Sequence, residues 1–220
     1  TLISASMIIT TASDKGGVGK STLSFHLAAA IAELGDSKVL LIDGDANRSV
    51  LGWAERTDPD KLPFTVIGEK HASKWFQKGN QADHIIVDTQ ARPSDEDLKD
   101  LLEDTDLLLV PTTAQALSLD TLPQFLKRLS RLGGDVPYTF CLTIVDTRTK
   151  DEQDAREFLK AHDQPLLDGC MRSFSAYTKA SAQGVLVKDA RTDSGKKDGN
   201  AGIAWNDCVA IAKELLEGLA

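Results

Sequence analysis

Hydrophobic residues of this chain gather in short, nearly unbroken runs that alternate with segments of helical periodicity. The runs cover residues 7–9, 39–42, 64–67, 85–87, 107–110 and 140–145. Strands that are buried on both faces have this character, whereas a strand with one solvent-exposed face alternates polar and apolar residues. The pattern therefore predicts a mostly parallel sheet that is covered by helices.

Two of the segments between these runs place their leucines and isoleucines on one helical face. They are residues 20–34 and 118–132, and each is followed by glycine, at Gly35 and at 133–134. Glycine is the usual residue just after a helix ends. Strict alternation of strand and helix predicts an α/β fold with one doubly wound sheet, formed by residues 1–220 as a single domain.

A glycine-rich loop lies between the first apolar run and the helix predicted over 20–34. Glycines let backbone N–H groups turn toward a phosphate, and a helix N-terminus adds positive potential there. In such a loop Lys20 reaches the β and γ phosphates of a nucleotide, and the Ser21 hydroxyl binds Mg²⁺. We therefore expect ATP and Mg²⁺ to bind at the loop, which consists of Lys15, Gly16, Gly17, Val18, Gly19, Lys20, Ser21 and Thr22.

The loop departs from the usual phosphate-loop pattern in two ways. Asp14 stands where that pattern has its first glycine, and Lys15 adds a second lysine. In this form, residues 15–22 resemble the deviant Walker A box of the ParA/MinD family of dimerising P-loop ATPases. The resemblance implies that two ATP molecules are held between two subunits and that Lys15 reaches the partner's nucleotide. A cation supplied in this way can accelerate hydrolysis by roughly 10³- to 10⁵-fold, so turnover would depend on dimerisation.

Three carboxylates follow predicted strands, at the strand ends where ligands bind in parallel sheets. Asp43 and Asp45 follow the run 39–42 and resemble the second box of the family. That resemblance implies that Asp45 positions or activates the attacking water and that Asp43 supports the Mg²⁺ shell. Asp88 follows the run 85–87, resembles a Walker B carboxylate and is a further candidate Mg²⁺ ligand.

Asp146 and Arg148 follow the last apolar run. The stretch resembles a family segment near the nucleotide and the dimer face, which implies that both residues contact nucleotide. An ordinary surface ion pair explains them equally well at this stage.

The chain is acidic, with 25 Lys and Arg against 33 Asp and Glu and a net charge of −8. It therefore cannot attract nucleic acid or anionic lipid over its whole surface. The segment 172–197 nevertheless carries a charge of +4, from six cations against two carboxylates. This segment also resembles the DNA-contacting part of the family, although a solvated basic surface is the alternative. The candidate DNA-binding residues are Arg172, Lys179, Lys188, Arg191, Lys196 and Lys197.

A second charged stretch has the opposite sign. Residues 95–106 hold seven carboxylates against Lys99. We expect this stretch to face away from DNA, either as a solvated helix face or as a surface for a basic partner peptide.

The resemblance favours a ParA-type positioning ATPase over two alternatives. Such a protein forms ATP-bound homodimers that bind DNA non-specifically and carry a plasmid or a protein organelle such as a carboxysome. A ParB-like or cargo-adaptor protein stimulates its hydrolysis, and it is cytoplasmic and nucleoid-associated. A MinD-like membrane ATPase needs a basic amphipathic tail, whereas residues 203–219 carry a charge of −2 and are expected to dock on the sheet. A nitrogenase-reductase-like enzyme would need cysteines soon after Asp88, and the next is Cys141. A P-loop enzyme acting on a small metabolite is the remaining alternative.

The cysteines Cys141, Cys170 and Cys208 are widely spaced and form no Cys-x-x-Cys pair, so we expect reduced thiols and neither a disulfide nor a zinc site. No run of 18 apolar residues occurs, so no membrane span is expected. Met7 is expected to be the natural start, with residues 1–6 left over from expression.

Overall fold

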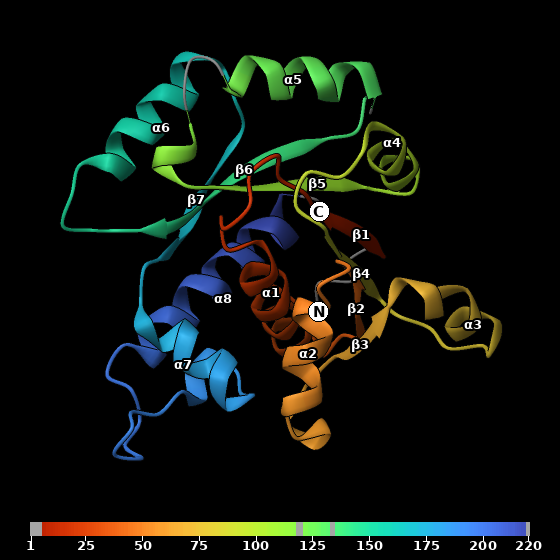
Figure 1. Ribbon diagram of the computed structural model, residues 1–220, viewed down its shortest axis with the longest axis vertical. Helices are drawn as coiled ribbons and strands as arrows, with labels where there is room; N and C mark the ends of the chain where they lie inside the picture. The colour runs from red at the N-terminus through yellow and green to blue at the C-terminus, as the bar shows by residue number, and fades with distance from the viewer. Residues whose placement is uncertain (1–5, 118–120, 133–134, 219–220) are drawn as a thin grey trace.

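The computed structural model describes residues 6–117, 121–132 and 135–218. These residues form a seven-stranded sheet in which every pairing is parallel. The strand order is β3-β2-β4-β1-β5-β6-β7, which puts the first strand at the centre (Figure 1). The predicted doubly wound α/β fold is thereby confirmed. The strands are β1 (Met7–Thr11), β2 (Val39–Gly44), β3 (Thr65–Gly68), β4 (His84–Thr89), β5 (Leu107–Thr112), β6 (Tyr138–Val145) and β7 (Leu166–Arg172).

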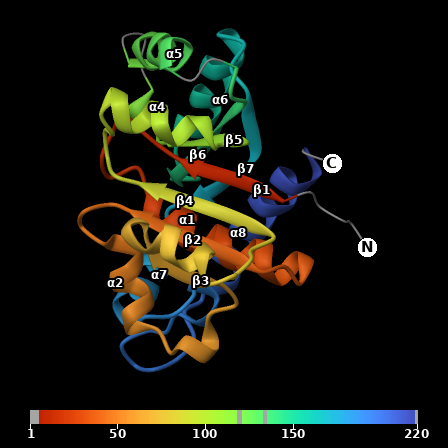
Figure 2. The same cartoon turned by 90° about the vertical axis from the view of Figure 1, so that its right-hand side faces the viewer.

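Helices cover both faces of this sheet. The described α-helices are α1 (Lys20–Gly35), α2 (Ser49–Arg56), α3 (Ala72–Gln77), α4 (Asp95–Glu103), α5 (Thr121–Leu132), α6 (Asp151–Ala161), α7 (Ser175–Gln183) and α8 (Ala201–Glu217). One core cluster joins α1, α2, α7 and α8 to one face of the strands. A second cluster joins α4, α5 and α6 to the other face, over β5 and β6 (Figure 2).

The helix that carries the glycine loop is held at the centre of the molecule. Leu23, Leu27 and Ile31 are fully buried on α1, where the sequence places its apolar face. Helix α8 packs against α1 and β7 with Ile211 and Leu215 buried, which confirms that this segment docks on the body of the protein. Within the described parts of the chain, no helix is both long enough and apolar enough to cross a membrane.

Two elements of the fold lack the apolar signal of the others. Strand β7 is interrupted by Asp168 and Gly169, and it lies at an edge of the sheet. Helix α6 is rich in charge and buries only Ala155 and Leu159.

Some element boundaries differ from those that the sequence predicts. Strand β6 begins two residues earlier than its apolar run, and Gly35 is the last residue of α1 rather than the residue after it. The glycines 133–134 lie outside the described residues.

Candidate nucleotide-binding site

The glycine loop connects β1 to α1 and adopts a conformation that needs its glycines. Gly17 and Gly19 have φ angles of 75° and 76°, in the left-handed region that L side chains rarely occupy. The loop borders a cavity of about 410 Å³ at the N-terminus of α1. All eight loop residues line this cavity, and Asp45, Asn47, Ser49, Trp53, Ala91 and Ser181 complete it. The structure therefore brings the predicted loop and the predicted catalytic carboxylate Asp45 together.

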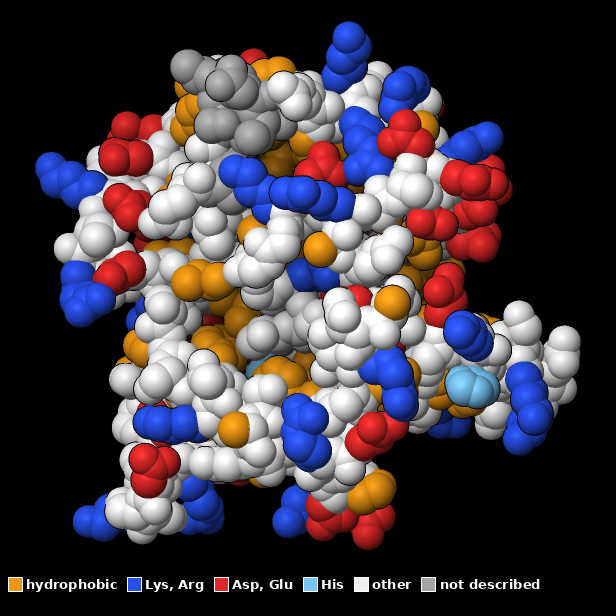
Figure 3. Space-filling model, in the orientation of Figure 1, with side chains coloured by type: hydrophobic (Ala, Val, Ile, Leu, Met, Phe, Trp, Pro, Cys, Tyr) orange, Lys and Arg blue, Asp and Glu red, His pale blue; other side chains and the backbone are white. Residues whose placement is uncertain are grey.

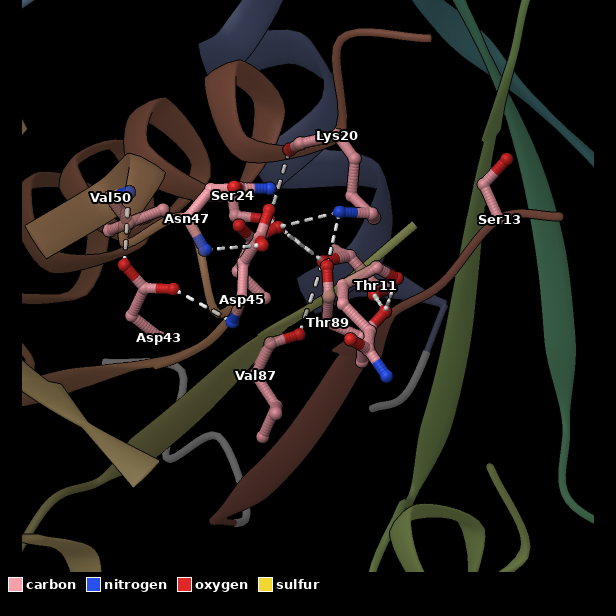
Figure 4. A network of polar contacts seen from close by, with 12 residues as sticks. Thr11, Ser13, Lys20, Ser24, Asp43, Asp45, Asn47, Val50, Val87 and Thr89 are labelled. Carbon is pink, nitrogen blue, oxygen red and sulfur yellow. Dashed lines mark hydrogen bonds and ion pairs between the residues drawn. The ribbon is translucent and has the colours of Figure 1, made fainter. Parts of the chain in front are cut away.

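Lys20 is buried beside the ends of β1 and β4. Its Nζ donates a hydrogen bond to the carbonyl of Thr89 and lies 3.7 Å from Asp88 Oδ1 (Figure 4). A lysine is seldom this buried without a carboxylate partner, because desolvation of an unpaired ammonium is costly. Asp88 supplies that partner at the floor of the loop.

Asp88 is fully buried, and its two carboxylate oxygens differ in their surroundings. Oδ1 accepts hydrogen bonds from Ser24 Oγ at 2.9 Å and Thr11 Oγ1 at 3.3 Å, whereas Oδ2 has no hydrogen-bond partner among the described residues. Burial raises the pKa of this carboxyl, and Lys20 opposes the shift. An orphaned buried acceptor close to the loop fits a site that is completed by a ligand-bound water or ion.

The side chains near the loop fit Mg²⁺ better than a metal that needs an all-protein cage. Among the residues described, no group of three or more His, Cys, Asp or Glu is arranged to hold a metal. Mg²⁺ keeps several waters and takes one or two protein ligands together with phosphate oxygens. Ser21 and the free oxygen of Asp88 are the groups that would hold it, and the ion would neutralise charge on the phosphates.

Asp43 has a structural role that its sequence context does not reveal. Its Oδ2 accepts hydrogen bonds from the N–H groups of Val50 and Leu51 at 3.1 and 2.8 Å, in the first turn of α2. Its Oδ1 accepts one from the N–H of Asp45 at 3.0 Å (Figure 4). Asp43 therefore caps α2 and orients Asp45, while its place in the Mg²⁺ shell stays a prediction.

The end of β6 meets the loop through Thr143 and Ile144. Thr143 Oγ1 donates to the carbonyl of Val18 at 2.6 Å, and the Ile144 side chain lies against Gly19. Asp146 and Arg148 lie beyond this contact and outside the cavity lining. Arg148 donates to Asp146 from its backbone N and from its guanidinium, at 2.6 to 3.0 Å, which lowers the pKa of Asp146 to about 2. Their nucleotide contact stays a prediction.

Two arginines that the sequence did not single out hold the start of the loop. Arg128, on α5, forms an ion pair with Asp14, and Arg92 Nε donates to the carbonyl of Asp14 at 2.9 Å. Lys15 follows this clamp, is half-buried and lines the cavity. Asp14, at the position of the usual first glycine, was the only sequence signal for this clamp.

The six predicted DNA-binding cations divide into two groups. Arg172, Lys179 and Lys188 form ion pairs with Asp207, Asp198 and Glu33. Arg191, Lys196 and Lys197 are exposed in a turn that an antiparallel bridge between residues 191 and 197 closes. Figure 3 shows blue and red side chains mixed over the lower end of the molecule, where this turn lies. Only the second group presents cations without carboxylate partners among the described residues.

Comparison with known proteins identifies the family. Residues 9–187 match the model described as "CobQ/CobB/MinD/ParA nucleotide binding domain". The chain belongs to this family. The CobQ/CobB/MinD/ParA relatives include the maintenance of carboxysome distribution protein A of Gloeobacter kilaueensis. It is 29% identical over 211 residues, which cover 94% of this chain and 93% of the relative.

Solved structures with lower sequence identity share the fold. A putative plasmid partition protein from Borrelia burgdorferi, bound to AMPPNP, is 22% identical with a TM-score of 0.72. The match covers 97% of this chain and 99% of that one. The MinD cell division protein of Aquifex aeolicus is 18% identical with the same TM-score, over 96% of this chain and 98% of that one.

Proposed function

We propose that this protein is a ParA-type positioning ATPase. It dimerises around ATP and Mg²⁺, binds DNA non-specifically as the ATP-bound dimer, and positions a plasmid or a protein organelle. A ParB-like or cargo-adaptor protein stimulates hydrolysis and releases the dimer. The full-length similarity to a carboxysome distribution protein supports the organelle as cargo. On this proposal the protein works in the cytoplasm, on the nucleoid.

One observation carries the proposal: the two-lysine loop and Asp45 line the same cavity. Backbone N–H groups of residues 16–20 and the N-terminus of α1 can hold the phosphates. The side chain of Lys20 is buried beneath the loop, where its Nζ can turn from the carbonyl of Thr89 to a phosphate oxygen. Asp45 lies across the cavity, where it can orient a water for attack on the γ phosphate.

Lys15 has a different task in the proposed dimer. It begins the loop at the outer side of the cavity, next to the Asp14 clamp. A lysine there can reach a nucleotide held by a facing subunit, which would make hydrolysis conditional on dimerisation. Asp146, Arg148 and Lys15 are the residues that we assign to this dimer face.

The DNA surface of the proposed dimer consists of the exposed turn at 191–197. An acidic monomer that presents the three exposed cations of this turn has weak attraction for DNA, whereas a dimer doubles the number of contacts on one surface. ATP-dependent dimerisation would then switch DNA binding on.

DNA binding measured with ATP, with ADP and without nucleotide tests this function. We expect tight, sequence-independent binding with ATP alone, accompanied by a shift from monomer to dimer in analytical ultracentrifugation. Binding of ATP-loaded protein to anionic liposomes instead of DNA would favour the MinD-like alternative. ATP binding without either partner would favour a metabolic P-loop enzyme.

A further inference from the structure

A second cavity, larger than the nucleotide cavity, lies on the opposite face of the sheet. It has a volume of about 600 Å³ and is bounded by α3 on one side and α4 on the other. Its floor is the outer face of β1, β2 and β4, with Ile8, Ile42, Ile85 and Val87 as its apolar side chains. We call this feature the α3–α4 groove.

The groove is open because the connection between β3 and β4 contains little helix. In a doubly wound sheet, crossover helices cover both faces of the strands. Here that connection contributes α3, which has six residues, whereas α4, α5 and α6 cover the neighbouring strands. Figure 2 shows β1 and β4 between α4 and the short yellow helix α3, with no helix lying over them. An apolar strip of sheet is therefore left accessible within the described structure.

One wall of the groove adds an exposed aromatic side chain to this strip. Phe76, on α3, is 42% exposed, and its ring lies 5.0 Å from that of Trp75 in an edge-to-face arrangement. Leu101 faces the groove from α4. Exposed apolar surface of this kind, surrounded by polar residues, marks an interaction site in soluble proteins.

The charged residues at the edge of the groove are all acidic. Glu69, Asp97, Asp100 and Asp104 line it, and no Lys or Arg is among its described lining residues. The side chains of Asp100 and Asp104 make no hydrogen bond or ion pair with any described residue. Figure 3 shows acidic side chains gathered over α4. The groove therefore combines an apolar floor with a negative rim.

We propose that the α3–α4 groove binds a basic amphipathic helix of a partner protein. The apolar face of that helix would lie on the floor, and its Lys and Arg side chains would meet the rim carboxylates. From Ile85 to Gln90 the floor spans five residue-to-residue steps, which is about 17 Å of extended chain and matches a helix of about 11 residues. The bound helix would occupy the place that a crossover helix takes elsewhere on the sheet.

This surface is separate from the nucleotide cavity, so its test does not need the proposed ATPase activity. The probe is a fluorescein-labelled peptide of about twelve residues, with equal numbers of lysine and leucine and the leucines on one helical face. One control peptide has the same composition with its leucines spread around the helix, and another has glutamate in place of lysine. Fluorescence anisotropy, recorded without nucleotide, gives the affinity.

Two groove variants and one matched variant locate the binding. Asp100→Asn/Asp104→Asn should weaken binding of the amphipathic probe about fivefold at about 0.05 M salt, with a smaller effect at about 0.5 M. Phe76→Ala should weaken it about tenfold at both salt concentrations, because the contact is apolar. Glu157→Gln/Asp163→Asn removes the same net charge from exposed positions on α6 and in the turn after it, and should leave the affinity unchanged.

Four results would overturn the proposal. The first is a loss of probe affinity in Glu157→Gln/Asp163→Asn equal to that in the rim variant, and the second is binding of either control peptide as tight as that of the amphipathic probe. The third is a gain in probe affinity after removal of residues 1–5, and the fourth is self-association of the protein that Phe76→Ala abolishes. The first two would reduce the binding to non-specific attraction. The last two would assign the groove to the chain's own N-terminal residues or to a second copy. Because the proposed ATPase is measured separately, failure of either proposal leaves the other intact.

Discussion

His26 Nε2 accepts a hydrogen bond of 3.0 Å from the backbone N–H of Val187. The other ring nitrogen, Nδ1, lies 2.8 Å from the carbonyl of Thr22, so Nδ1 carries the proton and Nε2 is the acceptor. The neutral ring thus links the helix that begins at the phosphate loop to the 3₁₀ turn Val187–Asp189, which contains Lys188. Complete burial lowers the pKa of His26 to about 4.

The buried histidine should make the stability of the protein fall in mild acid. The pKa of His26 is about 6.5 in the unfolded chain and about 4 in the folded one, so the unfolded state binds the extra proton between these values. The contribution of His26 is complete above pH 6.5 and is lost as the pH falls toward 4, by about 3 kcal/mol in total. Urea unfolding of His26→Leu between pH 4 and 7 should show a flatter pH dependence than the parent. His71→Gln, at an exposed position, should keep the parental dependence of stability on pH. The same dependence in His26→Leu would show that His26 is not the group responsible.

Substitution of each of the two loop lysines should impair a different step. Lys20→Ala should abolish nucleotide binding, because it removes the buried cation next to the phosphates. Lys15→Ala should still bind a fluorescent ATP analogue and should lose turnover, measured as phosphate release. Lys38→Ala, at an exposed position, is the control. Normal turnover by Lys15→Ala would remove the trans-acting lysine from the mechanism.

Asp43 and Asp45 are two residues apart, and the structure predicts opposite phenotypes for them. Asp43→Ala removes the acceptor for three backbone N–H groups, so the free energy of unfolding should fall by about 2 kcal/mol. Asp45→Ala should leave the free energy of unfolding within about 0.5 kcal/mol, since Asp45 is half-buried and its side chain accepts, among the described residues, one hydrogen bond, from the N–H of Asn47. It should nevertheless trap an ATP-bound dimer on DNA. Parental ATP hydrolysis by Asp45→Ala would show that another group activates the water.

The salt dependence of DNA affinity should show how many exposed cations of the proposed DNA surface contact phosphate. If Arg191, Lys196 and Lys197 of both subunits contact phosphates, log affinity should fall against log salt with a slope of about −5. Lys196→Ala/Lys197→Ala should reduce the slope to about −2. Lys213→Ala removes an exposed cation from α8 and should not change it. An unaltered slope in the double variant would place the DNA surface elsewhere.

The sequence was sufficient for the parts of the fold and site that have local signals. Unbroken apolar runs located six of the seven strands, and the glycine loop located the start of α1 and the cavity beside it. Strand β7 was missed because an edge strand with Asp168 and Gly169 has no such run. Asp45 was placed at the cavity because carboxyl ends of parallel strands share one edge of the sheet.

The rest depends on contacts between residues that are far apart in the chain. No local pattern indicates that Asp43 caps a helix, that Arg128 holds Asp14, or that Asp207 pairs with Arg172. The last of these shows why a count of basic residues overstates the positive potential of a segment. Carboxylates outside the segment 172–197 form ion pairs with half of its six cations, and only the tertiary structure shows which half.

The position of β1 has a consequence for synthesis of the protein. The first strand pairs with β4 and β5 on its two sides, and α1 is packed by α8, the last helix described. A ribosome releases the chain N-terminus first, at about 5 to 20 residues per second. The elements that pack around the phosphate loop are therefore synthesised well after the loop itself. Nucleotide capture at this loop would follow only after α8 has been made and packed against α1.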